Sequence, residues 1–159
     1  MRIGNGYDVH QLAEGEELWL GGIYINHSKG TVGHSDGDVL IHAICDALLG
    51  AANMRDIGFH FPDTSSDYKN IDSKILLKKT IEIITKKGYE ICNIDTTVAL
   101  QKPKIINFIP QMQEILAKTM NIPIDNISIK ATTTEKLGFV GKEEGVEAYA
   151  VVLLQDIKI

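Results

Sequence analysis

Three side chains in the first part of the chain could together bind a catalytic zinc ion. Asp8 and His10 are separated by one residue, and His42 follows later. Alternate side chains of a strand leave the same face, so Asp8 and His10 would lie side by side, roughly 6.5 Å apart along the strand. A helix must then deliver His42. Three nitrogen or oxygen ligands with one free coordination position are typical of a catalytic rather than a structural zinc site.

The metal interpretation has plain alternatives. An Asp-x-His pair often arises by chance, and a lone histidine is usually a core or surface residue with an ordinary hydrogen bond, which is how we interpret His27 and His60. His42 on the polar side of a predicted helix strengthens the case for a metal. Asp46, one turn later, could hold the second ring nitrogen of His42 or could be a solvated helix residue.

Two further segments carry residue types that bind anions or hard cations. Residues 35–38 resemble part of a calcium loop, but Leu40 stands where an oxygen ligand is needed and no glutamate closes the loop, which excludes calcium. A helix start with a histidine and a serine favours an anion site instead. In residues 130–136, the spacing of Thr132 and Glu135 fits either a helix capping box or a phosphate site with a cation such as magnesium at Glu135.

Three shorter segments leave their role open. Residues 56–58 and 61–64 have the composition of ordinary turns. Residues 102–104 form a basic turn before a predicted helix, and could be a surface loop or a phosphate and nucleotide contact.

Strands and helices must position these residues. Strand patterns fall at about 2–9, 18–26, 90–100, 126–132 and 146–154, with a hairpin at Gly21-Gly22, and helical spacing falls at about 38–51, 73–86 and 107–120. Ser35 or Asp36 could cap the first helix and Asp72 the second, while Pro110 fits the first turn of the third. We expect an α+β fold with helices packed on one face of a mixed, mainly four-stranded sheet, whose other face could take a partner subunit.

Composition limits the class of protein. The 159 residues are 44% hydrophobic and 23% charged, which predicts one domain spanning 1–159. A net charge of −5 argues against nucleic acid. Because no apolar run approaches the roughly 18 residues of a spanning helix and the chain starts in a strand pattern, we expect a cytoplasmic protein without a membrane partner. Cys45 and Cys92 are interpreted as core thiols.

Taken in order, these segments resemble the 2-C-methyl-D-erythritol 2,4-cyclodiphosphate synthase family along essentially the whole chain. The likeness rests on residues 6–10, 34–39, 42–43, 46–51, 56–58, 61–64, 103–104 and 130–139. Each segment alone is weak, but together, in order and at the family's spacing, they are specific.

The resemblance implies a homotrimer with active sites between neighbouring subunits. The substrate would be 4-diphosphocytidyl-2-C-methyl-D-erythritol 2-phosphate, whose 2-phosphate attacks the β-phosphate of the diphosphate. That step closes 2-C-methyl-D-erythritol 2,4-cyclodiphosphate and expels CMP, in the non-mevalonate isoprenoid pathway. The enzyme would be a phosphorus–oxygen lyase.

The same match assigns residues. Asp8, His10 and His42 match the zinc ligands, and Glu135 matches the ligand of a second divalent cation, Mg²⁺ or Mn²⁺. His34 and Thr133 match the residues that stabilise the transition state. The matched substrate-binding positions are Asp8, His10, His34, Ser35, Asp56, Ile57, Gly58, Phe61, Pro62, Asp63, Thr64, Leu100, Pro103, Lys104, Ile105, Ile106, Thr132, Thr133, Thr134, Glu135, Phe139 and Lys142.

Two of these positions depart from the family pattern. Leu100 stands where alanine is common in the turn that cradles cytosine. Lys142 replaces an arginine of a cavity on the threefold axis, and keeps the charge without the bidentate fork.

Two other functions follow from the residues without the resemblance. A zinc hydrolase would activate water at the free zinc position, with Asp63 or Asp36 as the base. A trimeric binding module would keep the pocket without turnover.

Overall fold

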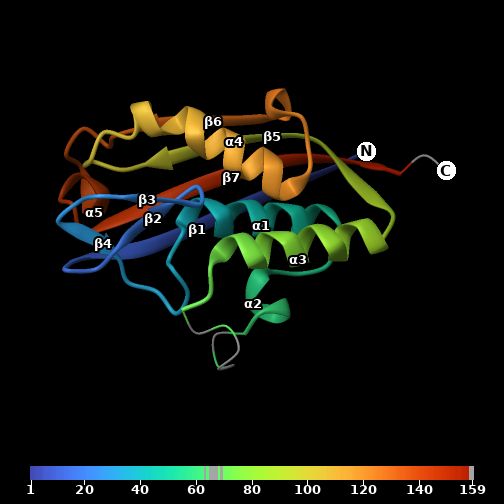
Figure 1. Cartoon of the computed structure of the whole chain (residues 1–159), viewed down its shortest axis with the longest axis horizontal. Coiled ribbons are helices and arrows are strands. Elements are labelled where there is room, and N and C mark those ends of the chain that lie inside the picture. The colour runs from blue at the N-terminus through green and yellow to red at the C-terminus, as the bar shows by residue number, and fades with distance from the viewer. Residues whose placement is uncertain (63, 65–67, 69, 158–159) are drawn as a thin grey trace.

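A mixed five-stranded sheet forms one layer of the molecule, and three long helices form the other (Figure 1). The structure is a computed structural model that describes residues 1–62, 64, 68 and 70–157. The strand order is β4-β1-β7-β5-β6. The strands are β1 (Arg2–Glu14), β4 (Lys29–Thr31), β5 (Tyr89–Ala99), β6 (Ile127–Thr132) and β7 (Gly145–Asp156). All neighbours pair antiparallel except β5 and β6, which are parallel.

The predicted α+β fold is confirmed, with more strands than expected. Residues 18–26 form the predicted hairpin as a separate two-stranded sheet of β2 (Leu18–Leu20) and β3 (Ile23–Ile25). Its turn uses positive φ angles of 60° at Gly21 and 80° at Gly22. The short strand β4 was not predicted because its three residues, Lys-Gly-Thr, show no apolar alternation and pair only at the edge of β1.

The three predicted helices are present with nearly the expected bounds. They are α1 (Val39–Ala51), α3 (Ser73–Lys86) and α4 (Ile109–Met120), the last preceded by the 3₁₀ turn η2 (Ile106–Phe108). Two helices of four residues each, α2 (Ile57–His60) and α5 (Gly138–Gly141), and the 3₁₀ turn η3 (Ile124–Asn126) complete the fold. Asp72 caps α3 and Pro110 lies in the first turn of α4, as predicted.

The cap of α1 differs from the prediction of Ser35 or Asp36. Asp38 is the N-cap, and its carboxylate accepts from the backbone N–H of Ile41. The same fully buried carboxylate accepts from the N–H groups of Gly21 at 3.0 Å and Gly22 at 2.7 Å. The contact with the distant hairpin therefore holds Asp38 at the cap position in place of the two predicted candidates.

Helix α1 lies unusually close to β1, and this approach determines where His42 sits. A Cβ on Gly4 or Gly6 would collide with the backbone of α1, and at Gly6 it would lie 1.9 Å from the Ala43 carbonyl oxygen. Only glycine permits this spacing. Since His42 precedes Ala43, the close approach holds the His42 ring beside Asp8 and His10 of β1.

The sheet face away from α1 is open and apolar. Ile3 is 74% exposed, and Tyr7, Val9, Tyr149 and Val151 are exposed beside it. Cys45 is buried in the core as predicted, and Cys92 is half-buried; both are free thiols. In the described part of the chain no helix has the length and apolar character that crossing a membrane requires.

Candidate metal centre and adjoining cavity

Asp8, His10 and His42 converge on one point, as the sequence predicted. His10 Nε2 lies 2.9 Å from Asp8 Oδ2, and His42 Nδ1 lies 3.0 Å from the same oxygen. The two ring nitrogens are 3.1 Å apart. Tetrahedral zinc with bonds of about 2.0–2.1 Å separates its donor atoms by about 3.3 Å. The three donors therefore fit a zinc ion after a movement of a few tenths of an ångström, and they form a candidate metal group within the described residues.

The hydrogen bonds of the outer ring nitrogens fix which nitrogen faces the metal. His10 Nδ1 lies 3.1 Å from the carbonyl oxygen of Val32. A carbonyl only accepts, so Nδ1 carries the proton and Nε2 keeps its lone pair for the metal. On His42, Nδ1 faces Asp8 and Nε2 lies 2.9 Å from the Ser73 hydroxyl. The two rings thus offer opposite nitrogens to a shared centre.

The electrostatics of the triad suit a cation. Burial alone would raise the pKa of Asp8, but hydrogen bonds from His10 and His42, with their charges, outweigh burial and lower this pKa to about 2. Burial likewise opposes protonation of His10, yet the Asp8 carboxylate beside it raises the pKa of His10 above its ordinary value. The Asp8 carboxylate therefore stays ionised. At the His10 ring nitrogen, a metal ion must compete with a proton for the lone pair.

Asp46 does not hold His42, contrary to one of the two sequence interpretations. Its Oδ1 accepts from the backbone N–H of Ile57 at 2.7 Å. Instead, His42 Nε2 lies 2.9 Å from the hydroxyl of Ser73, which the sequence analysis missed, and 3.2 Å from that of Ser35. Ser73 reads in sequence as the first residue of a helix after its Asp72 cap, so no local signal marks it.

A cavity of about 330 Å³ opens beside the triad. It brings together six of the predicted substrate-binding residues with the metal ligand His42, and it adds three side chains that were not predicted. The predicted members are His10, His34, Ser35, Ile57, Gly58 and Phe61, and the additional ones are Tyr68, Ile71 and Leu76, next to His42. The metal centre therefore has a neighbouring space that is polar at one end and largely apolar elsewhere.

The rest of the predicted loop lies around this cavity or outside the described residues. Asp56 uses its carboxylate to cap α2, accepting from Phe59 N–H at 2.9 Å. Pro62 and Thr64 are exposed and do not line the cavity. Asp63, predicted to bind substrate or to act as a hydrolase base, lies outside the described residues.

The second predicted group, residues 100–106 and 132–135, lies at the same end of the sheet but several strands away. Asp8 pairs with Ala148, Ala148 with Val98, and Val98 with Ala131. This row crosses three strand spacings, or about 14 Å at ~4.8 Å each. Neither segment contributes a described residue to the cavity. Within one chain, the two predicted halves of the site are separate.

Residues 132–135 form a turn rather than the start of a helix, so the capping-box interpretation is wrong. The next helix, α5, starts only at Gly138, and its N-cap is Leu137. Thr133 Oγ1 lies 3.3 Å from both the N–H and the carboxylate of Glu135, whose φ is +52°. The hydroxyls and the carboxylate are exposed at this turn, as an anion or cation site would need.

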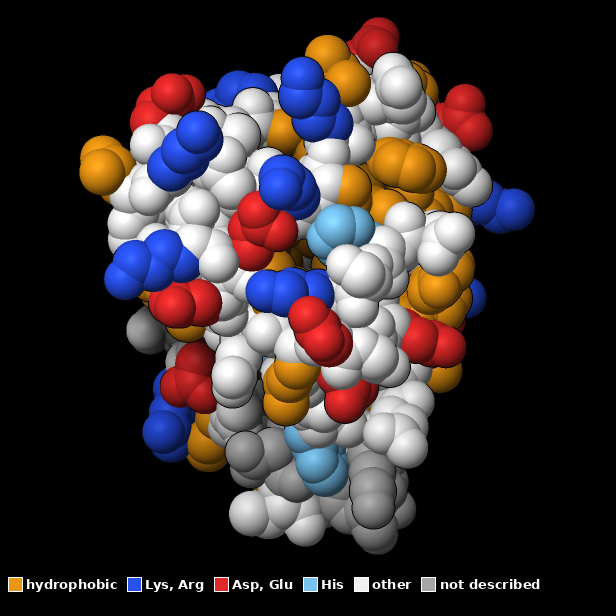
Figure 2. Space-filling model, turned by 90° about the vertical axis from the view of Figure 1, so that its left-hand side faces the viewer, with side chains coloured by type: hydrophobic (Ala, Val, Ile, Leu, Met, Phe, Trp, Pro, Cys, Tyr) orange, Lys and Arg blue, Asp and Glu red, His pale blue; other side chains and the backbone are white. Residues whose placement is uncertain are grey.

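In the neighbouring segment 100–106, some of the side chains predicted to bind substrate are buried in the core. The Leu100 N–H donates to the Thr132 carbonyl at 3.0 Å, which joins the two segments. Leu100 and Ile105 are 5% and 3% exposed, so a ligand here could meet their backbone but not their side chains. Lys102 pairs with Glu143 at 3.0 Å. Figure 2 views this end of the molecule and shows basic side chains, Lys or Arg, interspersed with carboxylates around a histidine.

Comparison with known proteins gives one consistent match. The model of the YgbB family matches residues 1–155. The 2-C-methyl-D-erythritol 2,4-cyclodiphosphate synthase of Bacteroides fragilis is 66% identical over 157 residues, 99% of each chain. The synthase of Porphyromonas gingivalis is 60% identical over 153 residues, covering 96% of this chain and 94% of its own.

Solved structures agree with the sequence matches. A 2C-methyl-D-erythritol-2,4-cyclodiphosphate synthase in a CDP-bound form superimposes with a TM-score of 0.90 at 35% identity, over 97% of this chain and 100% of the other. The CDP complex of IspF from Plasmodium falciparum gives 0.86 at 38% identity, over 99% and 97%. The bifunctional IspDF of Campylobacter jejuni gives 0.95 at 43% identity, over 99% of this chain and 42% of that protein.

Proposed function

The chain belongs to the YgbB family, and from this premise we propose that it carries out the cyclodiphosphate synthase reaction. It converts 4-diphosphocytidyl-2-C-methyl-D-erythritol 2-phosphate to 2-C-methyl-D-erythritol 2,4-cyclodiphosphate and CMP, in the non-mevalonate isoprenoid pathway. In class it acts as a phosphorus–oxygen lyase. The observation that carries the proposal is the convergence of Asp8, His10 and His42 in a chain 66% identical to such a synthase over its length.

The reaction asks mainly for positioning and for neutralisation of charge. Two phosphoryl groups of like charge must approach in line, and the attacking phosphate oxygen is already ionised, so no general base is required. When bound, zinc at Asp8, His10 and His42 and a second divalent cation, Mg²⁺ or Mn²⁺, at Glu135 supply alignment and charge neutralisation. The side chains around the cavity would bind and orient the substrate and exclude water.

Each group of residues has a distinct proposed task. His34 and Thr133 stabilise the charge that develops on the phosphoryl oxygens. The hydroxyls of the methylerythritol and the ribose are held by Ser35, Asp56, Gly58 and Asp63. The apolar lining of Phe61, Ile71 and Leu76 limits the entry of water, which would otherwise compete with the internal phosphate.

A homotrimer would join the two separate halves of the site. The 100–106 turn, with Thr132, would complete the cavity of a neighbouring subunit and hold the cytidine, with Thr133 and Glu135 beside it, while Phe139 and Lys142 would line a cavity on the threefold axis. Two observations support this proposal: the cavity beside the triad takes no described residue from these segments, and the face of the sheet opposite α1 is open and apolar. Relatives solved with CDP show that such folds accept this nucleotide.

The hydrolase alternative loses one of its two candidate bases. The Asp36 carboxylate accepts from both the backbone N–H and the hydroxyl of Ser73, so it is engaged away from the free position of the metal. This leaves phosphoryl transfer within the substrate as the function that the geometry supports best.

Incubation of the purified, metal-loaded protein with the cytidine diphosphate substrate tests the proposal. We expect CMP and the cyclic diphosphate in equal amounts. Chromatography and ³¹P NMR measure the two products. CMP with a linear product would instead show a hydrolase, and tight binding without turnover would show a binding module. Light scattering of the same sample tests the trimer.

A further inference from the structure

Two residues outside the metal ligands connect His42 to the rest of the fold, and we propose that Ser73 and Asp36 position the His42 ring for metal binding. This inference rests on the proposed function. Ser73 Oγ lies 2.9 Å from His42 Nε2. The Ser73 hydroxyl donates to Asp36 Oδ1, and its backbone N–H donates to Asp36 Oδ2 at 2.9 Å. The three side chains form a continuous chain of hydrogen bonds that ends at the metal centre.

The order of donors in this chain favours one tautomer of His42. An ionised carboxylate only accepts, so Asp36 takes the single hydroxyl proton of Ser73. The Ser73 oxygen can then only accept from His42, so the Ser73–Asp36 pair favours the ring proton on Nε2. Without metal, the Asp8 carboxylate 3.0 Å from Nδ1 favours the proton on that nitrogen, and a bound metal ion would take the place of that proton. A metal ion needs the ring in the Nε2–H form.

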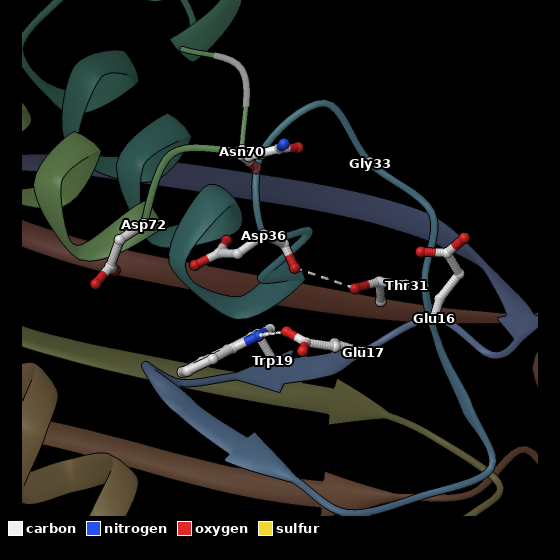
Figure 3. Close-up of a pocket in the computed structure, with 9 residues that line it drawn as sticks. Glu16, Glu17, Trp19, Thr31, Gly33, Asp36, Asn70 and Asp72 are labelled. Atoms are coloured by element: carbon white, nitrogen blue, oxygen red, sulfur yellow. Dashed lines mark hydrogen bonds between the residues drawn. The ribbon is translucent and has the colours of Figure 1, made fainter.

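The Asp36 carboxylate is itself held on several sides. Its Oδ1 accepts from the Asp38 N–H at 3.2 Å, and the Asp36 N–H donates to the Ile71 carbonyl at 3.1 Å. Figure 3 shows Asp36 on the loop that leads from Thr31 into α1, with its carboxylate directed toward the start of α3. The chain therefore joins this loop and α3 to the ligand on α1.

Ser35 offers a hydroxyl to the same nitrogen but is placed for a different role. Its Oγ lies 3.2 Å from His42 Nε2, and Ser35 lines the cavity beside the triad. Ser73 is fully buried and is not among the residues that line the cavity. A ligand in the cavity can take the Ser35 hydroxyl, whereas Ser73 stays with His42.

A capping role for the Ser73 side chain does not explain its position. Asp72 is the N-cap of α3, and its carboxylate accepts from the Lys74 N–H at 2.9 Å. The Ser73 hydroxyl makes no bond to its own helix and instead spans Asp36 and His42. Its loss should therefore act on the metal centre more than on α3.

Zinc affinity of the full-length protein provides the test, measured without substrate by competition with a chromophoric chelator. Partners behind a metal ligand typically contribute about 10- to 100-fold in affinity, and we expect Ser73→Ala to weaken zinc binding by at least about 10-fold. The matched control, Ser35→Ala, removes a hydroxyl from the same nitrogen and should weaken zinc binding much less than Ser73→Ala, because the Ser73–Asp36 pair remains in place. Equal zinc affinity of Ser73→Ala and the wild type would overturn the proposal.

A second measurement separates positioning from simple support of the fold. In the zinc-free protein, at alkaline pH, ¹⁵N chemical shifts report the tautomer of His42. We expect the Nε2–H form to be more populated in the wild type than in Ser73→Ala, where only Asp8 at Nδ1 still attracts the ring proton. Asp36→Asn, whose amide can donate to Ser73, should shift the population in the same direction and serves if Ser73→Ala does not fold. An unchanged tautomer in a folded variant would contradict the proposal.

The two proposals fail separately. A wild-type protein that binds zinc but forms no cyclic product would overturn the proposed function and leave the positioning pair intact. If the wild type were active and Ser73→Ala bound zinc as tightly as the wild type, the proposed function would stand and the positioning role of Ser73 and Asp36 would be overturned.

Discussion

The Asp46 carboxylate accepts a hydrogen bond from the backbone N–H of Ile57 at 2.7 Å, and so ties helix α1 to the wall of the cavity. One turn earlier, the same helix carries His42 into the metal centre. The ligand and the 56–58 turn are therefore placed by one rigid element. This half-buried contact limits the movement of either relative to the other.

Asp46→Ala should weaken substrate binding while leaving zinc in place. Loss of the carboxylate frees the Ile57 N–H, and hydrogen bonds to charged groups contribute about 1.5–3 kcal/mol, so we expect KM to rise roughly 10-fold or more. Asp46→Asn keeps an acceptor oxygen and should stay near the wild type. Steady-state kinetics with zinc analysis of each variant provides the check. Zinc loss in Asp46→Ala would mean that Asp46 acts on His42 after all.

His42→Ala should lose both bound zinc and turnover. Two ligands remain, and removal of a direct ligand should cost more than the roughly 100-fold typical of residues behind the ligands. Metal analysis by mass spectrometry and the CMP assay measure the two effects. The control is His27→Ala, since His27 lies outside the triad and the cavity. A metal-free His42→Ala protein with full activity would refute the ligand assignment.

Much of the fold was predictable because it follows from local patterns. The spacing of apolar residues located α1, α3 and α4, and Gly21-Gly22 marked the hairpin. The features that the sequence did not predict correctly, the cap of α1 and the strand β4, depend on contacts between residues far apart in sequence. The choice of Asp38 over Asp36 as the cap of α1 is made by the N–H groups of Gly21 and Gly22. The short strand β4 is defined only by its pairing with β1.

In the site, too, local spacing predicted some residues, while others depend on contacts between distant parts of the chain. Asp8 and His10 share a strand face, and their spacing predicted the metal centre. Ser73 could not be found this way, because its link to His42 joins residues 31 positions apart and involves an ordinary helix start. The distance between the triad and the 132–135 turn also follows from strand order, which the sequence pattern does not give.

The stability of the zinc-free protein should depend on pH through Asp8 and His10. The pKa of Asp8 is lowered from 3.8 to about 2, so its stabilising effect is present above 3.8 and is lost as the pH falls toward 2. The pKa of His10 is raised above 6.5, so its effect is complete below 6.5 and is lost as the pH rises through the folded value.

The difference in unfolding free energy between the wild type and Asp8→Asn isolates this pair. We expect the difference to be largest between about pH 4 and pH 6.5 and to shrink on both sides. Denaturant titrations of chelator-treated samples measure it. With zinc added, the trend above that window should reverse, because bound His10 must be deprotonated. A difference that grows steadily toward alkaline pH without zinc would contradict the assigned pair.

Gly6→Ala should destabilise the fold and disturb the metal centre together. The added Cβ would lie 1.9 Å from the Ala43 carbonyl oxygen, and backbone cannot yield as a side chain does. Overpacking typically costs 1–3 kcal/mol, and we expect about 3 kcal/mol here with weaker zinc binding, since α1 must move away from β1 with His42.

Gly50→Ala is the matched control on the same helix. Gly50 is exposed, and a Cβ there meets no atom closer than 4.0 Å, so alanine should stabilise α1 by about 0.5–1 kcal/mol through its higher helix propensity. Thermal unfolding and zinc titration of both variants decide the matter. If Gly6→Ala matched the wild type in zinc affinity despite its lower stability, the close approach of α1 to β1 would serve the core alone, and the position of His42 would have to be fixed by Ser73 and Asp36.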